Sequence, residues 1–245
     1  MSIPGQTALI FGATGQVGGH LLKELLASPH FTHVGEFGRR TTSLEVLDTA
    51  GKEKLEQRTL DFEKLNAAGL KDAKWDVVFI TLGTSAKAAG SSEAFERIDR
   101  EYVINAARAA KSDHPQRLIY VSSGGADSSS RFLYPRSKGL TEEGLASLGY
   151  SDTIVFRPGL LTGTSRPEFR LGETVAAAVT GLLSRVTSSV EIKVATLAQS
   201  LVKAAVLGSA ELPPVAKATQ VGKDGASFTL IGNAGALALA NFKSP

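Results

Sequence analysis

The sequence contains no cysteine among its 245 residues. The chain therefore has no disulfide, no thiolate metal site and no cysteine nucleophile, and its composition fits an intracellular compartment. The histidines show no metal-ligand spacing such as H-E-x-x-H, so no metal site is expected. They are His20, His30, His33 and His114.

The sequence also lacks an excess of charge of either sign, because 27 basic side chains are balanced by 24 acidic ones. No run of lysine and arginine is long enough to follow a phosphate backbone, so nucleic acid is not an expected partner. No apolar run approaches the ~20 residues that a membrane span needs. The N-terminus shows no basic region followed by an apolar stretch, so we expect a soluble protein without a signal peptide. Peripheral membrane association through a partner stays compatible with this sequence.

Short apolar runs alternate with longer stretches of helical spacing. This alternation predicts a parallel sheet with helices on both faces, since strands buried on both sides are continuously apolar. Strands are predicted at 7–11, 33–37, 55–60, 76–80, 117–121, 153–156 and 228–231. Helices are predicted at 17–27, 93–111, 135–148, 173–183, 196–207 and from 233 onward, with Pro135 at a first helical position. We expect one α/β domain (1–245) with a Rossmann-type doubly wound parallel sheet, in which about 158–225 form a small C-terminal substrate-side region.

A glycine-rich segment with the spacing G-x-x-G-x-x-G follows the first predicted strand and opens the first predicted helix. Gly12 permits the sharp turn, Gly15 lets the backbone approach a pyrophosphate, and Gly18 lets helix and strand pack closely. The helix N-terminus offers N–H groups and a positive dipole end to phosphates. Three glycines alone would indicate only a tight turn, but their position between a strand and a helix predicts a dinucleotide site.

The end of the second predicted strand indicates which dinucleotide is bound. An NAD site usually has a carboxylate there for the ribose 2′-OH, whereas this chain has Arg39 and Arg40 after Phe37-Gly38. Guanidinium groups match a 2′-phosphate, so NADP(H) is the predicted cofactor. Asp61 and Phe62 follow the third predicted strand and are candidates to flank the adenine, although simple turn chemistry explains that dipeptide equally well.

Tyr134 and Lys138 form a Y-x-x-x-K pair at the start of a predicted helix, where residues four apart share one face. Carbonyl reduction needs a proton for the oxygen, and a nearby cation lowers the pKa of a phenol, which is about 10 in water, toward working pH. Two serines end the preceding strand, in the crevice where such sheets bind ligands. We assign substrate positioning to Ser123 and cofactor contact to Ser122. Alone the pair would indicate packing, but with the glycine segment it predicts a Ser-Tyr-Lys catalytic set.

Together these residues resemble the short-chain dehydrogenase/reductase superfamily. The stretches GATGQVGG, GRR, TLGTSAKAAGSSEAFERIDREYV, VSSGGADSSSRFLYPRSKG and VFRPGLLTG are similar to the atypical branch that contains the HIV Tat-interacting oxidoreductase and fungal mitochondrial proteins. The resemblance covers about 7–172, and the tail SFTLIGNAGALALA is similar to the end of the fungal members. This chain departs from the family pattern after Lys138, where its acidic residues stand further along the helix, at Glu142 and Glu143. We expect both on the surface.

The resemblance implies an NADPH-binding fold in which Tyr134 donates a proton and Lys138 contacts the cofactor. It further implies cofactor contacts, which fall at Thr14, Gly15, Gln16, Val17, Arg39, Arg40, Leu82, Gly83, Leu161 and Arg166. The region from 180 to 217 matches only loosely, and such folds build the substrate pocket there, so the sequence does not name the substrate.

Two functions follow as hypotheses. The first is an NADPH-dependent oxidoreductase that reduces an aldehyde, ketone or quinone. The alternative is a redox-sensing regulatory module that binds NADPH and a protein partner, since one fold can host both. Sugar-nucleotide epimerase or dehydratase chemistry is a weaker third reading. A homodimer through the 93–111 or 135–148 helix is plausible, and the expected location is the cytoplasm or the outer surface of mitochondria.

Overall fold

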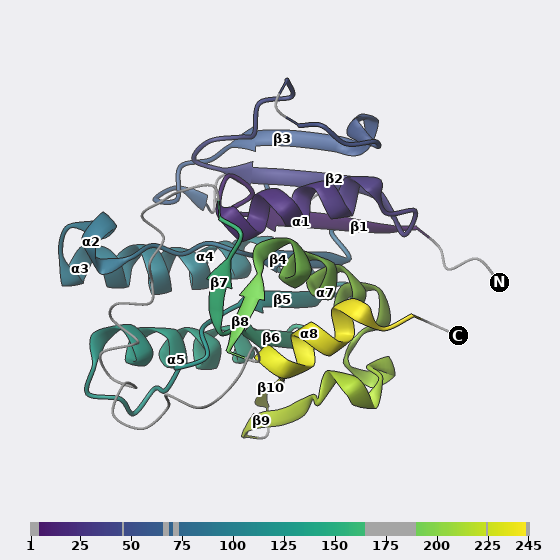
Figure 1. The fold of residues 1–245 in the computed structure, drawn as a ribbon. Helices are drawn as coiled ribbons and strands as arrows, with labels where there is room; N and C mark the ends of the chain where they lie inside the picture. The colour runs from purple at the N-terminus through teal and green to yellow at the C-terminus, as the bar shows by residue number, and fades with distance from the viewer. Residues whose placement is uncertain are drawn as a thin grey trace.

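The computed structural model describes residues 5–45, 47–65, 69–70, 74–164, 190–223 and 225–243. Its centre is an eight-stranded sheet in the order β3-β2-β1-β4-β5-β6-β10-β9, in which only the β10–β9 pair is antiparallel (Figure 1). The strands are β1 (Gln6–Phe11), β2 (Phe31–Gly38), β3 (Leu55–Thr59), β4 (Val77–Ile80), β5 (Arg117–Val121), β6 (Asp152–Arg157), β9 (Thr219–Lys223) and β10 (Ala226–Gly232). The predicted Rossmann-like α/β fold is confirmed.

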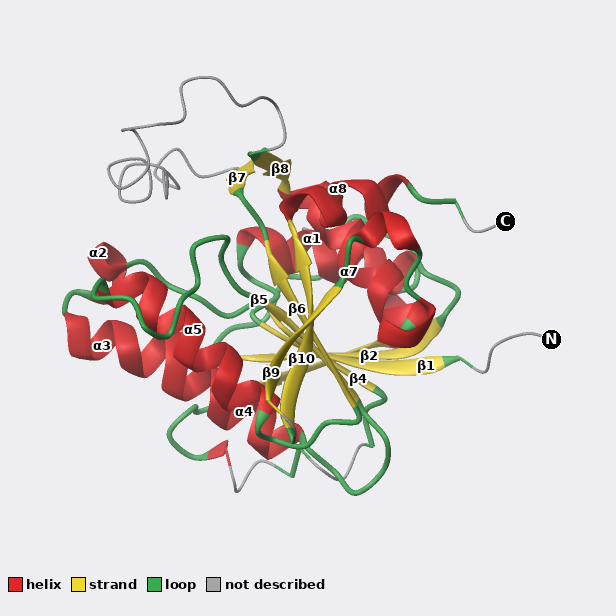
Figure 2. Cartoon of the chain, turned by 90° about the horizontal axis from the view of Figure 1, so that it is seen from below, coloured by secondary structure: helices red, strands yellow, loops and turns green. Residues whose placement is uncertain are grey.

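Helices cover both faces of the sheet (Figure 2). One face carries α1 (Gln16–Ala27), α7 (Val194–Leu207) and α8 (Asn233–Asn241), and α1 packs on α7. The other face carries α4 (Tyr102–Ala110) and α5 (Leu133–Ala146). Because β-strand side chains alternate between faces, each side of the sheet has its own buried core. Leu21 and Phe79 belong to the first core, and Trp75 and Tyr120 to the second.

The predicted helix at 93–111 has three parts in the structure. Helix α3 (Ser92–Glu96) continues into a π-helical turn, Arg97–Glu101, and then into α4. Such turns contain one extra residue and occur often at functional sites. Here the turn contains Asp99, which is fully buried and faces Lys138 of α5.

Helix α5 begins at Leu133, two residues before the predicted start, so Pro135 occupies the third helical position and not the first. Proline fits anywhere in the first turn, because the N–H groups there have no partner within the helix. Asp127 N–H donates to the Pro135 carbonyl at 3.0 Å and ties the loop after β5 to this turn.

Several short elements were not predicted from the sequence. They are β7 (Leu160–Thr162), which pairs with β8 (Glu191–Lys193), the edge strand β9, the short helix α2 (Ala86–Ala89), and 3-10 turns at Lys52–Lys54, Ser209–Glu211 and Pro214–Ala216. Within the region 158–225, α7 belongs to the helical layer on α1. The predicted helix 173–183 lies outside the described residues. Across the described ranges, no helix is both long and apolar enough to cross a membrane.

Candidate functional site

Most of the predicted site residues that the structure describes follow the carboxyl ends of β1 to β5 in the large sheet. The loop after β1 contacts the end of β4, where the N–H and the hydroxyl of Thr81 donate to the Phe11 carbonyl at 2.9 and 3.1 Å. Gly12 has φ of +95°, and a Cβ there would lie 2.8 Å from the Thr81 backbone. A Cβ on Gly18 would lie 2.1 Å from the Gly12 carbonyl oxygen. Both positions therefore require glycine.

Helix α1 begins directly behind this loop. Its N-cap residue, Gly15, has no side chain to cap the helix, and the first turn has no acidic residue. The positive end of the helix dipole is therefore not offset by side chains of its own first turn. Thr14 and Gln16 flank Gly15 at this end, and Val17 is buried beneath it. The glycine loop and the helix end together have the form of a phosphate-binding site.

The ends of β2 and β3 lie beside this loop. Arg39 and Arg40 are both exposed directly after β2. Asp61 accepts a hydrogen bond from the Glu63 N–H at 3.0 Å, which is the turn chemistry considered from the sequence. Phe62 is 6% exposed and packs on Phe11 and Tyr102, with ring centroids 6.4 and 5.4 Å apart. Phe62 is thus a core residue at the edge of the site.

The ends of β4 and β5 form the next part of the edge. Leu82 is half-buried, whereas Gly83 is exposed, and a Cβ on Gly83 would lie 3.7 Å from Lys138 Nζ. Ser122 is buried, and its hydroxyl has no hydrogen-bond partner among the described residues. Ser123 is half-buried and remains accessible.

Helix α5 brings Tyr134 and Lys138 onto one face, as their spacing predicts. Lys138 Nζ lies 5.9 Å from the centroid of the Tyr134 ring, and that ring packs on Phe95 at 5.9 Å. Lys138 is 4% exposed, although lysine is rarely buried without a partner. Its partners are Asp99 Oδ1 at 3.0 Å and the Tyr120 hydroxyl at 3.2 Å.

Asp99 is the site residue that the sequence analysis missed. The carboxylate is fully buried on the π-helical turn, and its Oδ1 also accepts the Thr84 N–H at 3.3 Å. Oδ2 has no hydrogen-bond partner within the described ranges. In the sequence, Asp99 is noticeable only as a charged residue at a position where the helical pattern calls for an apolar one. That pattern does not reveal which residue is its partner.

The electrostatics of this cluster favour a charged Lys138. Burial alone lowers the pKa of a lysine, but the Asp99 carboxylate outweighs it and raises the pKa of Lys138 well above its ordinary value. Burial also raises the pKa of Tyr120, although the Lys138 charge opposes that effect. Lys138 is therefore a fixed cation and Tyr120 a neutral hydroxyl.

One expectation for α5 was wrong. Glu142 is 1% exposed, and not a surface residue, because it lies one turn after Lys138 on the buried side of the helix. Arg157 at the end of β6 pairs with it through two contacts, Nε to Oε1 at 2.9 Å and Nη2 to Oε2 at 2.5 Å. Glu143 is exposed as expected.

Two predicted cofactor residues remain, Leu161 and Arg166, both late in the stretch that the family resemblance covers. Leu161 lies in β7 and packs against the core on the α1 side of the sheet. Arg166 lies outside the described residues.

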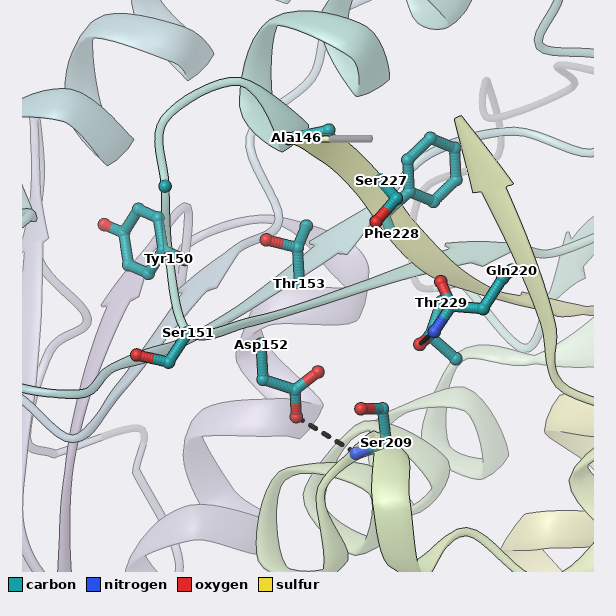
Figure 3. Close-up of a pocket in the computed structure, with 12 residues that line it drawn as sticks. Ala146, Tyr150, Ser151, Asp152, Thr153, Ser209, Gln220, Ser227, Phe228 and Thr229 are labelled. Carbon is teal, nitrogen blue, oxygen red and sulfur yellow. Dashed lines mark hydrogen bonds between the residues drawn. The ribbon is translucent and has the colours of Figure 1, made fainter. Parts of the chain in front are cut away.

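A pocket of about 260 Å³ lies away from this edge, where β6 begins and where β9 and β10 pair (Figure 3). Asp152 in its wall accepts hydrogen bonds from Arg117 Nε at 2.7 Å and from the Ser209 N–H at 3.0 Å. The side chains drawn in Figure 3 are mostly polar, and none of them is a predicted site residue. The pocket therefore belongs to the opposite end of the sheet.

The edge residues suit a nicotinamide dinucleotide. A glycine loop that excludes side chains faces an uncapped helix N-terminus, and exposed arginines stand at the end of the next strand. A buried lysine, Lys138, and a buried hydroxyl that no described residue hydrogen-bonds, Ser122, lie farther along this edge of the sheet. The groups along this edge of the sheet are chemically complementary to the phosphates, the ribose and the ring amide of such a cofactor.

Comparisons with solved structures support the fold. The UDP-N-acetylglucosamine 4-epimerase from Methanobrevibacter ruminantium superposes with a TM-score of 0.60 at 18% identity, over 83% of this chain and 74% of that one. The UDP-Glc/GlcNAc 4-epimerase from Campylobacter jejuni gives 0.58 at 15% identity, over 81% and 73%. At these identities the likeness concerns the fold alone.

Sequence relatives define the family. A family model described as NAD(P)H-binding matches residues 12–205. The Emericella nidulans protein "Protein fmp52, mitochondrial" is 36% identical over 184 residues, which are 74% of this chain and 78% of that protein. The Rattus norvegicus protein "Protein HTATIP2" is 38% identical over 178 residues, 73% and 72% of the two chains. The chain therefore belongs to the NAD(P)H-binding family and is an atypical short-chain dehydrogenase/reductase.

Proposed function

We propose that this protein is an NADPH-dependent oxidoreductase that reduces a small carbonyl compound, namely an aldehyde, a ketone or a quinone. The observation that carries the proposal is the pair of Tyr134 and Lys138 on α5, with Lys138 held by buried Asp99 beside the end of β4. A protein that only bound a dinucleotide would not need a buried lysine with its own carboxylate partner next to an accessible phenol.

The residues divide the chemistry among them. The nicotinamide supplies a hydride to the carbonyl carbon when bound. Tyr134 donates the proton that the carbonyl oxygen takes up, since its ring is half-buried and its hydroxyl has no hydrogen-bond partner among the described residues. The Lys138 cation stabilises the phenolate that remains and contacts the ribose. Ser123 is the hydroxyl that orients the substrate oxygen, because Ser122 is buried beneath it.

A substrate panel tests the proposal. Purified protein is mixed with NADPH and with aldehydes, ketones and quinones in turn, and the loss of NADPH absorbance is followed. Turnover on any class supports the reductase and begins to define its substrate. Tight NADPH binding without turnover on any compound would contradict it and favour the regulatory module that binds a protein partner.

The preference for NADP(H) over NAD(H) is part of the proposal, and it rests on Arg39 and Arg40. Replacing both with serine is expected to raise the Kd for NADPH roughly 100-fold, because each hydrogen bond to a charged phosphate is worth ~1.5–3 kcal/mol. The Kd for NADH should change little, since NADH has no 2′-phosphate. Fluorescence titration with both cofactors measures the two constants. Arg108→Ser, at an exposed arginine of α4, is the matched control, and equal losses for both cofactors would exclude this assignment.

A further inference from the structure

A carboxylate outside the proposed catalytic set lies two residues before the end of β2. Glu36 is 1% exposed, and it is paired in the parallel register with Gln57 on the neighbouring strand β3. Among the described residues, no lysine, arginine or histidine forms an ion pair with it. A buried charge without a counter-ion is costly unless hydrogen bonds replace its water.

Three hydrogen bonds do so. The N–H and the hydroxyl of Thr42 both donate to Glu36 Oε1 at 2.7 Å, and Gln57 Nε2 donates to Oε2 at 2.7 Å. Gln57 Nε2 also donates to the Thr42 carbonyl at 2.7 Å. We call Glu36, Thr42 and Gln57 the Glu36 clamp. Both carboxylate oxygens accept hydrogen bonds within it, and the side chain is buried, so Glu36 is not presented to a ribose hydroxyl.

The clamp closes the turn that carries the two arginines. On one side, the Gly38 carbonyl accepts the Leu60 N–H at 2.8 Å, and a Cβ on Gly38 would lie 3.2 Å from the Arg40 carbonyl oxygen. On the other side, Thr42 is held by Glu36. The segment between these anchors contains Arg39 and Arg40, and both side chains are exposed. Its backbone is therefore fixed at both ends while its guanidinium groups face solvent.

We propose that the Glu36 clamp determines cofactor specificity by positioning Arg39 and Arg40 for the 2′-phosphate of NADPH. This inference rests on the NADPH preference proposed above. A turn whose backbone is ordered before binding loses less conformational entropy when the phosphate binds. The clamp also holds the carboxylate of β2 inside the protein, away from a ribose 2′-OH, which is the group that a carboxylate at the end of this strand would recognise.

The test separates the clamp from the arginines themselves. Thr42→Val removes one donor to Glu36 with almost no change in shape, and Glu36→Gln removes the charge. A displaced turn is expected to lose about one hydrogen bond between an arginine and the 2′-phosphate. Each variant should therefore raise the Kd for NADPH about tenfold and leave the Kd for NADH nearly unchanged. Glu56→Gln is the matched control, because Glu56 is a partly exposed carboxylate on β3 that pairs with His33 and Arg58. It should leave both constants as they are.

The outcomes distinguish the two proposals. If Arg39→Ser/Arg40→Ser abolishes the NADPH preference while both clamp variants keep it, the clamp has no role in specificity, and the proposed cofactor stands. If the double arginine variant keeps the preference, the cofactor assignment fails and the inference fails with it. Equal weakening of NADPH and NADH binding by the clamp variants would also overturn it. Should Glu36→Gln fail to fold, as judged by circular dichroism, Thr42→Val alone decides.

Discussion

Replacing Tyr134 with phenylalanine is expected to lower kcat for carbonyl reduction by about 10²–10⁴, the usual contribution of a positioned general acid. The ring contacts with Phe95 and the Lys138 cation persist in the variant, because they involve ring atoms and not the hydroxyl. The fold and the Kd for NADPH should therefore change little. The measurement is steady-state NADPH oxidation on the best substrate of the panel, beside a fluorescence titration of NADPH.

Tyr150→Phe is the matched control for this variant. It removes a tyrosine hydroxyl that donates to the Ala107 carbonyl at 2.7 Å, far from the carboxyl ends of the strands. Its activity should stay near that of the wild type, although its stability should fall slightly. If Tyr134→Phe kept the kcat of the wild type on a compound that the wild type reduces, the proton would have to come from another group.

Asp99→Asn is expected to lower the free energy of unfolding by about 3 kcal/mol at pH 7, because it leaves the Lys138 ammonium buried without a counter-charge. Removing one partner of a buried ion pair is costly even where the pair itself adds little stability. The double variant Asp99→Asn/Lys138→Met should recover most of the loss, since it buries no charge. Urea denaturation of the wild type, both single variants and the double variant measures the coupling.

The loss of unfolding free energy in Asp99→Asn is expected to decrease as the pH rises. In the wild type the pKa of Lys138 is raised, so the pair stabilises the fold fully below the unfolded lysine pKa of about 10.4 and loses its effect only as pH rises through the folded value. In Asp99→Asn, burial without a counter-charge lowers the pKa of Lys138 instead. The gap between the two proteins should therefore be largest near pH 7 and shrink toward pH 10. A gap that stayed constant over this range would show that packing, and not charge, links the two residues.

Activity gives a separate readout of Asp99 as a positioning residue. If it acts only through Lys138, then Asp99→Asn should lower kcat and weaken NADPH binding together, because the lysine serves both the phenol and the ribose in the proposed site. Asp99→Glu keeps the charge and should restore part of the activity. Loss of stability without any change in kcat or Kd would limit Asp99 to a structural role.

Local patterns in the sequence were enough to predict the main strands, the glycine loop and the tyrosine-lysine pair. The apolar runs at β1, β4 and β5 are contiguous, the glycine loop joins a strand to a helix within seven residues, and Tyr134 and Lys138 are one helical turn apart. Each of these features depends on neighbours in the chain, so periodicity and turn chemistry reveal it. The same reasoning failed for the short strands β7, β8 and β9, because three to five residues carry too little pattern.

The tertiary structure decided which charges are buried and with which partners. Asp99 meets Lys138, Glu142 meets Arg157, and Glu36 meets Gln57 because separate helices and strands pack together. The contact of Glu36 with Thr42 is local, but it depends on the path of the turn after β2. The sequence shows that a residue is charged, but not whether water or a partner surrounds it. Burial of a charge is a property of the assembled fold. The sequence by itself determined the sheet, the phosphate loop and the tyrosine-lysine spacing. The tertiary structure determined which carboxylates are buried beside those groups, because most of their contacts join separate helices and strands.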